Sequence, residues 1–188
     1  MSYWIQTFSG KRFDLENPRP ADVDIVDIIQ ALSNICRFNG HCRQRYTVLE
    51  HSVRVAEIVP EEFRFTALLH DAGEAYYGDI TRPLKMVLHE LTKYETRCGP
   101  AKPFQWFLDK IDAAIASAFG TTYPLPECVK HADDVLLATE ARDLMGPPPE
   151  PWVRLPDPLP DVITPMYESV AYTRFVEMFH AYKPSEVR

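Results

Sequence analysis

Most of the chain carries hydrophobic residues at the three- and four-residue spacing of amphipathic helices. Between Asp22 and Cys36, apolar side chains recur at mostly this spacing and stop at a polar loop. The same pattern predicts further helices over 47–59, 61–77, 83–96, 103–119, 126–145 and 166–182. Breaking residues such as Pro60 and Gly78 interrupt the pattern between them. The sequence therefore predicts an all-α protein of six or seven helices.

The two ends of the chain depart from this helical pattern. Two short aromatic, β-favouring runs flank Ser9 and Gly10, which predicts a small hairpin. The consecutive prolines between Gly146 and Trp152 favour an extended connector. We expect one domain over residues 1–188, because 188 residues can bury a substantial single core. Its expected parts are a hairpin and arm over 1–20, a helical core over 22–145, a Pro-rich connector over 146–165 and a C-terminal helix over 166–182.

The charge and the hydropathy of the chain exclude several classes of partner. Its formal net charge is −7, and no Lys/Arg cluster is long enough to follow a duplex, so stable nucleic-acid binding is disfavoured. No apolar stretch approaches the ~20 residues that cross a bilayer, so we expect no membrane partner. The N-terminal residues lack the basic region followed by an apolar run that is typical of an export signal. The cysteines form no C-x-x-C pair. These features predict a cytoplasmic protein with reduced thiols at Cys36, Cys42, Cys98 and Cys128.

A histidine and a carboxylate stand side by side at His70 and Asp71, near the middle of an otherwise apolar predicted helix. Such a buried pair must be hydrogen-bonded or bind a metal, because an unpaired buried charge is strongly unfavourable. Glu74 follows one helical turn later, so it should lie close to both. An isolated His-Asp pair is more often structural than functional. The residues elsewhere in the chain must therefore decide between the two interpretations.

Two other predicted helices offer further metal ligands. His51 lies beside an apolar helix face, where a lone histidine is more often a core or capping residue than a ligand. In the helix over 126–145, Asp133 falls at the edge of the apolar stripe and Asp134 lies about 100° further round. Asp133 should point inward and Asp134 towards water. Glu140 shares the inward sector, either as a partner of a ligand or in a structural salt bridge. The nitrogen and oxygen ligands that Zn, Mn, Co or Fe accept would come from His51, His70, Asp71 and Asp133.

In this arrangement the sequence resembles a known family. The four residues match, in order and approximate spacing, the H…HD…D signature of the HD-domain metal-dependent phosphohydrolases. The segment 70–85 is similar to the HDxxExxxGDxxxPxK segment of the 5′-deoxyribonucleotidase branch. The segments 37–40, 46–53 and 138–145 are also similar to compact bacterial and phage members, including the phage dATP triphosphohydrolases. The resemblance covers about residues 22–145.

The resemblance implies an HD-domain helical fold with a metal-centred site. His51, His70, Asp71 and Asp133 would bind a divalent transition metal (Zn, Co, Mn or Fe), and a second divalent ion (Mg or Co) could accompany it. The implied catalytic residues are Glu74 and Asp79, which would orient the attacking water and protonate the leaving oxygen. The implied substrate-binding residues are Arg37 and Lys85 at the phosphate and Asn39 and Pro83 at the nucleoside. Weaker candidates for a β- or γ-phosphate are Arg43, Arg45 and Arg82, and a surface salt bridge is the competing role for Lys85.

The function that this resemblance implies is hydrolysis of a deoxynucleotide. The leading expectation is cleavage of dATP to deoxyadenosine and triphosphate, with a 5′-deoxyribonucleotidase that releases phosphate from dNMPs as the alternative. A non-enzymatic nucleotide- or metal-binding regulator is a third candidate, but Glu74 and Asp79 would be dispensable for binding alone. A phosphodiesterase is less favoured because the segment 70–85 is closer to the nucleotidase branch. Family members assemble as dimers or hexamers, so we expect a homo-oligomer in a bacterium or a phage-infected host cell.

Overall fold

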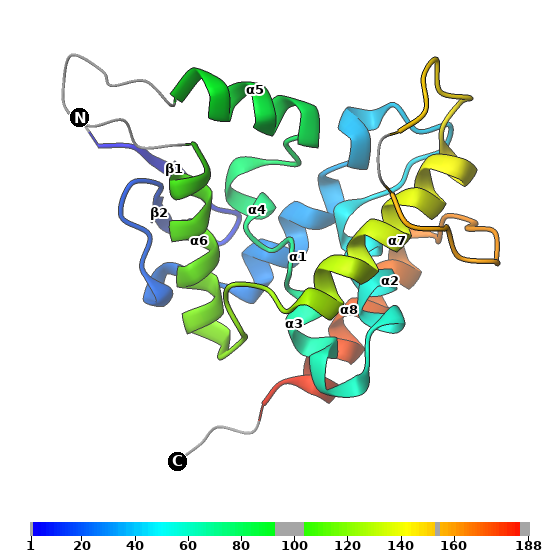
Figure 1. The fold of residues 1–188 in the computed structure, drawn as a ribbon. Coiled ribbons are helices and arrows are strands. Elements are labelled where there is room, and N and C mark those ends of the chain that lie inside the picture. Colours follow the sequence, from blue (N-terminus) through cyan, green and yellow to red (C-terminus); the bar gives the residue numbers. More distant parts are fainter. Residues whose placement is uncertain (1, 93–103, 153–154, 185–188) are drawn as a thin grey trace.

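The chain folds into a bundle of helices with a short β-hairpin near its N-terminus (Figure 1). The computed structural model describes residues 2–92, 104–152 and 155–184. The hairpin strands are β1 (Trp4–Gln6) and β2 (Arg12–Asp14), and three short 3₁₀ helices are η1 (Pro20–Asp22), η2 (Arg37–Gly40) and η3 (Glu61–Phe63). The α-helices of the described residues are α1 (Ile25–Asn34), α2 (Val48–Ile58), α3 (Arg64–Leu68), α4 (Glu74–Tyr77), α5 (Arg82–Thr92), α6 (Phe104–Phe119), α7 (Glu127–Leu144) and α8 (Glu168–Tyr182).

The predicted N-terminal hairpin is confirmed, and it packs against the helices. Strands β1 and β2 are antiparallel, with Ile5 opposite Phe13. The ring of Phe13 is buried and stacks on Tyr76 of α4, with the ring centroids 3.7 Å apart. At the hairpin turn, the backbone N–H of Ser9 donates to Asp27 of α1 over 2.6 Å. The hairpin is therefore attached both to α1 and to the segment that follows His70 and Asp71.

Helix α2 lies at the centre of the bundle and carries His51. It packs against α1, α3, α7 and α8. The hydroxyl of Thr47 caps its first turn by accepting from the N–H of Glu50 over 3.2 Å. Every residue from Val48 to Val53 is buried, so this part of the helix has no solvent-facing side. His51 consequently faces the protein interior.

The single helix predicted over 61–77 is wrong, and this changes the surroundings of His70 and Asp71. The structure has η3, α3 and α4 there, with a turn over residues 69–73 that contains both site residues. The ring Nδ1–H of His70 donates to the carbonyl of Ala67 over 2.7 Å, which stabilises the turn. Gly73 lies so close to the Asp112 carboxylate that a Cβ would overlap it. The described residues form eight α-helices rather than six or seven because this segment divides into two.

The remaining predicted helices are confirmed within the described residues as α1, α2, α5, α6, α7 and α8. The predicted boundaries at Thr96 and Pro103, and Cys98, lie outside the described residues. Over 146–165 the described residues form no helix or strand, as expected of a connector. Arg142 of α7 donates hydrogen bonds to the carbonyls of Leu159 and Asp161, which hold this connector against α7. No helix of the described residues is long and apolar enough to cross a membrane.

Candidate metal centre

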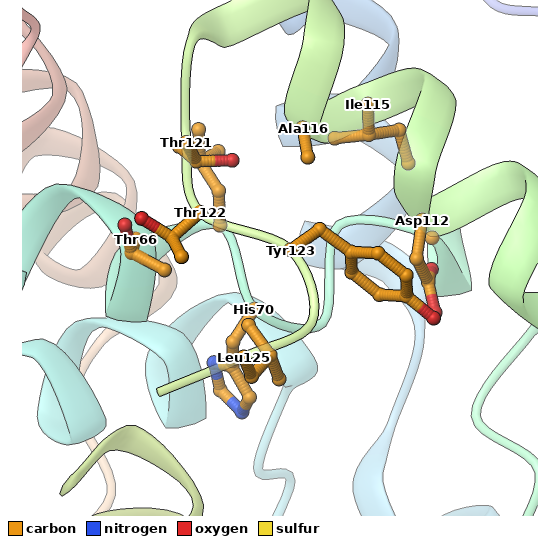
Figure 2. Close-up of a pocket in the computed structure, with 11 residues that line it drawn as sticks. Thr66, His70, Asp112, Ile115, Ala116, Thr121, Thr122, Tyr123 and Leu125 are labelled. Atoms are coloured by element: carbon orange, nitrogen blue, oxygen red, sulfur yellow. The ribbon is translucent and has the colours of Figure 1, made fainter. Parts of the chain in front are cut away.

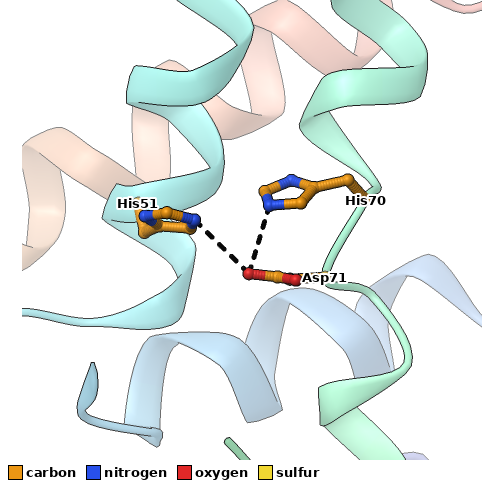
Figure 3. Close-up of side chains that lie close together, drawn as sticks. All are labelled: His51, His70 and Asp71. Carbon is orange, nitrogen blue, oxygen red and sulfur yellow. Dashed lines mark ion pairs between the residues drawn. The ribbon is translucent and has the colours of Figure 1, made fainter. Parts of the chain in front are cut away.

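Two histidines from different elements converge on one carboxylate (Figure 3). The Nε2 atom of His51, on α2, lies 3.4 Å from Oδ2 of Asp71, and the Nε2 atom of His70 lies 3.2 Å from the same oxygen. One ligand atom from each of the three residues lies within 4.8 Å of the others, so the group could hold a metal ion. Both Nε2 atoms are buried, and neither has an aligned hydrogen-bond partner in the described part of the chain. These are the atoms that a metal would satisfy.

Asp133 approaches the same centre from α7. Its Oδ1 atom lies 3.1 Å from Nε2 of His51, although it stands outside the compact group of three. Its neighbour Asp134 turns away and accepts a hydrogen bond from Arg82 over 2.7 Å, at the surface. Asp133 thus faces His51 as the helix phase predicts, although the side chains of Asp133 and Asp134 are similarly exposed, at 30% and 37%. Asp133 could therefore add a further carboxylate to the group of three, from α7.

Behind His51 lies a buried network of charged groups. Oε1 of Glu140 lies 2.6 Å from Nδ1 of His51, and Arg37 donates to Oε2 of Glu140 over 2.9 Å. A second terminal nitrogen of Arg37 lies 3.5 Å from Oδ2 of Asp71. His51 and Glu140 are fully buried, and Arg37 is 8% exposed. Glu140 therefore takes both roles considered from the sequence, since it partners a candidate ligand and forms a salt bridge.

The charges of the centre strongly perturb its acid–base equilibria. Burial and the Arg37 charge oppose protonation of His51, but the Glu140 and Asp133 carboxylates outweigh them and raise its pKa to about 10. Burial opposes ionisation of Asp71, yet the neighbouring His70, His51 and Arg37 hold its pKa well below the usual range. The pKa of Glu140 is likewise lowered, because the Arg37 and His51 charges outweigh its burial. Carboxylates held in the ionised state are the form that binds a cation.

Glu74 and Asp79, the two predicted catalytic carboxylates, lie near this centre in different environments. Glu74 is 2% exposed, and its Oε2 atom has no partner among the described residues. Burial, and then the Asp71 and Asp79 charges, raise the pKa of Glu74 well above its ordinary value. Burial also raises the pKa of Asp79, whose Oδ2 accepts from the N–H of Phe38 over 3.1 Å. Glu74 is thus suited to hold a proton that an ordinary glutamate would lose.

The predicted substrate-binding residues are dispersed between the interior and the surface. Lys85 is half-buried on α5, with its Nζ atom 3.8 Å from Oε1 of Glu74. Asn39 and Pro83 are exposed, whereas Arg37 is buried among the carboxylates described above. Two of the weaker candidates have surface partners, since Arg45 donates to Glu168 and Arg82 to Asp134. Lys85 is therefore the predicted phosphate ligand that combines proximity to Glu74 with access to solvent.

An aromatic pair at the site was missed from the sequence. Phe38 has a φ of 55°, which is uncommon for a bulky side chain and indicates a constrained backbone. Its ring lies 6.1 Å from that of Trp152 in the Pro-rich connector, in an edge-to-face arrangement. The N–H of Phe38 binds Asp79, so this constrained turn sits directly against a candidate catalytic residue. No periodicity in the sequence could have linked residues 38 and 152.

His70 also lines a small cavity (Figure 2). Its volume is about 30 Å³, and its lining includes His70, Asp112 and Tyr123 but none of His51, Asp71 and Asp133. A cavity of this size accommodates about one water molecule. Burial and the Asp71 charge raise the pKa of Asp112 to about 7. The cavity is thus too small for a nucleotide.

The two neighbouring aspartates of α7 provide a matched test of the ligand set. Asp133→Asn should abolish metal binding or turnover, because it replaces the carboxylate that faces His51 Nε2 with a neutral amide, which is a weaker metal ligand. Asp134→Asn should be nearly silent, since it removes only an exposed ion pair worth ~0–1 kcal/mol. Metal content and steady-state kinetics of the two variants, measured side by side, check this expectation. Equal values for both would show that Asp133 is not a ligand.

Comparisons with known proteins place the chain among relatives of its own length. No family model matches it. It is 39% identical over 180 residues to the uncharacterized protein YfdR of Escherichia coli K12, and the match covers 94% of each chain. It is 33% identical over 156 residues to the uncharacterized protein RCAP_rcc00048 of Rhodobacter capsulatus, covering 76% of this chain and 74% of the relative. The chain therefore belongs to the same protein family as YfdR.

Proposed function

We propose that this protein is a metal-dependent phosphohydrolase of the HD-domain class, with dATP as its leading substrate and deoxyadenosine and triphosphate as products. The observation that carries the proposal is the convergence of two buried, unsatisfied Nε2 atoms on Asp71. Asp133 faces His51 from α7, so the four residues of the H…HD…D signature lie close together. A purely structural cluster would have no need to leave both nitrogens without aligned partners.

The donor set fits a divalent transition metal. Two imidazoles and two carboxylates are the ligands that Zn, Co, Mn or Fe accept. Such an ion, held by His51, His70, Asp71 and Asp133, would supply Lewis acidity and lower the pKa of water at the site. A second divalent ion (Mg or Co) could bind beside the first, because Asp79 provides a further carboxylate near Glu74. The low pKa of Asp71 keeps that residue ionised for binding at neutral pH.

The residues around the centre would then divide the acid–base work. Glu74 keeps a proton because of its burial, and it would donate that proton to the 5′ oxygen as the bond to phosphorus breaks. Asp79 is fixed through Oδ2 by the N–H of Phe38, which leaves its other oxygen to orient the attacking water. Lys85, on the solvent side of Glu74, would neutralise phosphate charge. Protonation of the leaving oxygen and attack of water on phosphorus together yield the free nucleoside.

Product analysis tests this proposal directly. Metal-loaded protein is incubated separately with dATP, dAMP and a cyclic dinucleotide, and the products are separated by chromatography. We expect deoxyadenosine and intact triphosphate in equal amounts from dATP. Orthophosphate from dAMP, with no triphosphate from dATP, would establish the 5′-deoxyribonucleotidase alternative. Binding of the nucleotides without any product would instead identify a regulator.

Lys85→Ala should impair dATP turnover more than dAMP turnover. A triphosphate carries additional charge, which a chain of net charge −7 must neutralise locally, and Arg45 and Arg82 are already paired with carboxylates. Loss of one charged contact of ~1.5 kcal/mol corresponds to about a 10-fold lower kcat/KM for dATP. The ratio of kcat/KM for the two substrates is the measurement. Lys130→Ala, which changes a lysine paired with Glu127 on α7, is the control. Equal losses on both substrates would make Lys85 a general phosphate ligand.

A further inference from the structure

The network behind His51 has a geometry that a simple salt bridge does not require. Glu140 is fully buried between His51 and Arg37, and each of its two oxygens meets a different partner. Arg37 in turn reaches from Glu140 to Asp71. The network therefore touches two of the candidate ligands from behind, through groups that the metal itself would not contact.

We infer that Glu140 is a positioning residue of the metal centre, and that Arg37 holds Glu140 and Asp71 in place rather than binding phosphate. This inference rests on the metal-binding part of the proposed function, but not on the identity of the substrate. It assigns a role to Glu140 and changes the role expected for Arg37.

Glu140 determines which ring nitrogen of His51 carries a proton. An ionised carboxylate only accepts hydrogen bonds, so the 2.6 Å contact with Oε1 of Glu140 places the proton on Nδ1. A metal that displaces the other ring proton then meets the lone pair on Nε2, which faces Asp71 at 3.4 Å and Asp133 at 3.1 Å. A carboxylate behind a histidine ligand fixes both its tautomer and its orientation and makes it a stronger donor to a metal. Glu140 therefore selects the form of His51 that can bind a metal.

Arg37 fixes the orientation of Glu140. Arg37 donates to Oε2 over 2.9 Å, so Glu140 cannot turn away from His51 without breaking a charge-assisted hydrogen bond. Another terminal nitrogen of the same guanidinium lies 3.5 Å from Oδ2 of Asp71. A planar fork that spans two carboxylates fixes their relative positions, which a lysine could not do as well. Arg37 thereby links the orientation of His51 to that of Asp71.

The guanidinium of Arg37 is not available to bind phosphate. Its terminal nitrogens are directed at Glu140 and Asp71, and only 8% of the residue is exposed. Moving the guanidinium to a substrate would leave Oε2 of Glu140 buried without its charged partner, which is unfavourable. Buried ion pairs also contribute little net stability compared with apolar residues of similar size. Retaining this network at the metal centre is thus best explained by ligand positioning.

Cobalt affinity provides the test. In Glu140→Gln the side chain keeps its size, but an NH2 donor replaces one of the two oxygens, so it no longer offers one acceptor atom to His51 and another to Arg37. We expect cobalt affinity, measured by competition with a chelator in substrate-free protein, to fall about 10–100-fold. The visible absorption of the bound cobalt should change as well, because the orientation of a nitrogen ligand changes. Glu140→Gln that is folded and binds cobalt as the wild type does would overturn the inference.

Glu50→Gln is the matched control. Glu50 is also a buried glutamate, and it precedes His51 in the same helix. Its carboxylate bonds to Arg54 and to the N–H of Met166 instead of to a candidate ligand. Both variants should lose thermal stability, but Glu50→Gln should keep wild-type cobalt affinity and absorption. A similar loss of affinity in both variants would reduce the effect to general destabilisation and overturn the inference.

Arg37→Gln keeps the inference testable if Glu140→Gln does not fold. A positioning residue affects cobalt affinity with no phosphate in solution, whereas a phosphate ligand affects KM and leaves that affinity unchanged. We expect lower cobalt affinity in Arg37→Gln, and unchanged affinity with a raised KM would return Arg37 to the phosphate. If the wild type itself binds no cobalt, the proposed function fails. If the wild type binds cobalt and the variants do so equally well, only the positioning role fails.

Discussion

Asp71→Ala should remove both the metal and the activity of this protein. Asp71 provides the oxygen on which His51 and His70 converge, at 3.4 and 3.2 Å. Its loss removes the central anionic ligand, and with it several kcal/mol of transition-state stabilisation, on the order of 10³-fold in rate. Wild-type protein should hold about one transition metal per chain, as expected for one site with four protein ligands. Elemental analysis together with the product assay measures both effects.

The control for Asp71→Ala is Asp134→Asn, which also removes a carboxylate charge but leaves the centre intact. Metal stripping should in addition lower the thermal stability of the wild type, because the ligands join α2, α7 and the turn over 69–73. The Asp71 variant should show no such difference between stripped and metal-treated samples. Full activity of stripped wild-type protein in the presence of chelator would contradict the whole metal proposal.

Glu74→Gln should slow turnover by about 10²–10⁴-fold while leaving metal content unchanged. Glutamine is neutral and similar in size, so it should be tolerated in the buried position, but it cannot donate a proton to the leaving oxygen. Glu74 itself is prepared for that role, since burial and the nearby Asp71 and Asp79 charges raise its pKa. Single-turnover rates on metal-loaded protein measure the effect. A near wild-type rate would exclude Glu74 as the acid.

The pH profile distinguishes a proton donor from a residue that only supports the fold. A group with a raised pKa carries its proton below that pKa and loses it as the pH rises. The wild-type rate should therefore fall on the alkaline side, and Glu74→Gln should lack this limb. Asp112→Asn is the control, because Asp112 is a half-buried carboxyl whose pKa is also raised, to about 7, and it lines the cavity beside His70. Persistence of the limb in Glu74→Gln would assign it to a different group.

Periodicity predicted most of the helices because their boundaries depend on local residues. Thr47 caps α2 and Asp24 caps α1 through side-chain oxygens next in sequence to the helices. The turn over 69–73 was not predicted because the apolar pattern continues through it, with Leu68, Leu69 and Ala72 all buried. The turn instead brings Gly73 so close to Asp112 on α6 that no side chain would fit there, which is a tertiary contact. A pattern of alternating polarity carries no record of such a contact.

The candidate ligands could be predicted from their order and from helix phase, whereas their support could not. Asp133 was distinguished from Asp134 by its angle to the apolar stripe, and the structure places it at His51. The burial of Arg37 was not predictable, since its partner Glu140 lies 103 positions later in the chain. The left-handed backbone conformation of Phe38 and the contact of its ring with Trp152 could not be predicted either. Long-range contacts decided each of these features.

Helix α7 supplies Asp133 to one side of His51 and Glu140 to the other, and it is made late in synthesis of the chain. The ribosome delivers His51, His70 and Arg37 well before either carboxylate exists, and early segments begin to fold while later ones are still being added. A nascent chain therefore holds His51, His70 and Asp71 before Asp133 and Glu140 can join them. A chain truncated before α7 keeps the group of three but lacks Asp133 and the Glu140 partner of His51. It should therefore bind a metal more weakly than the full chain, however well its first helices fold.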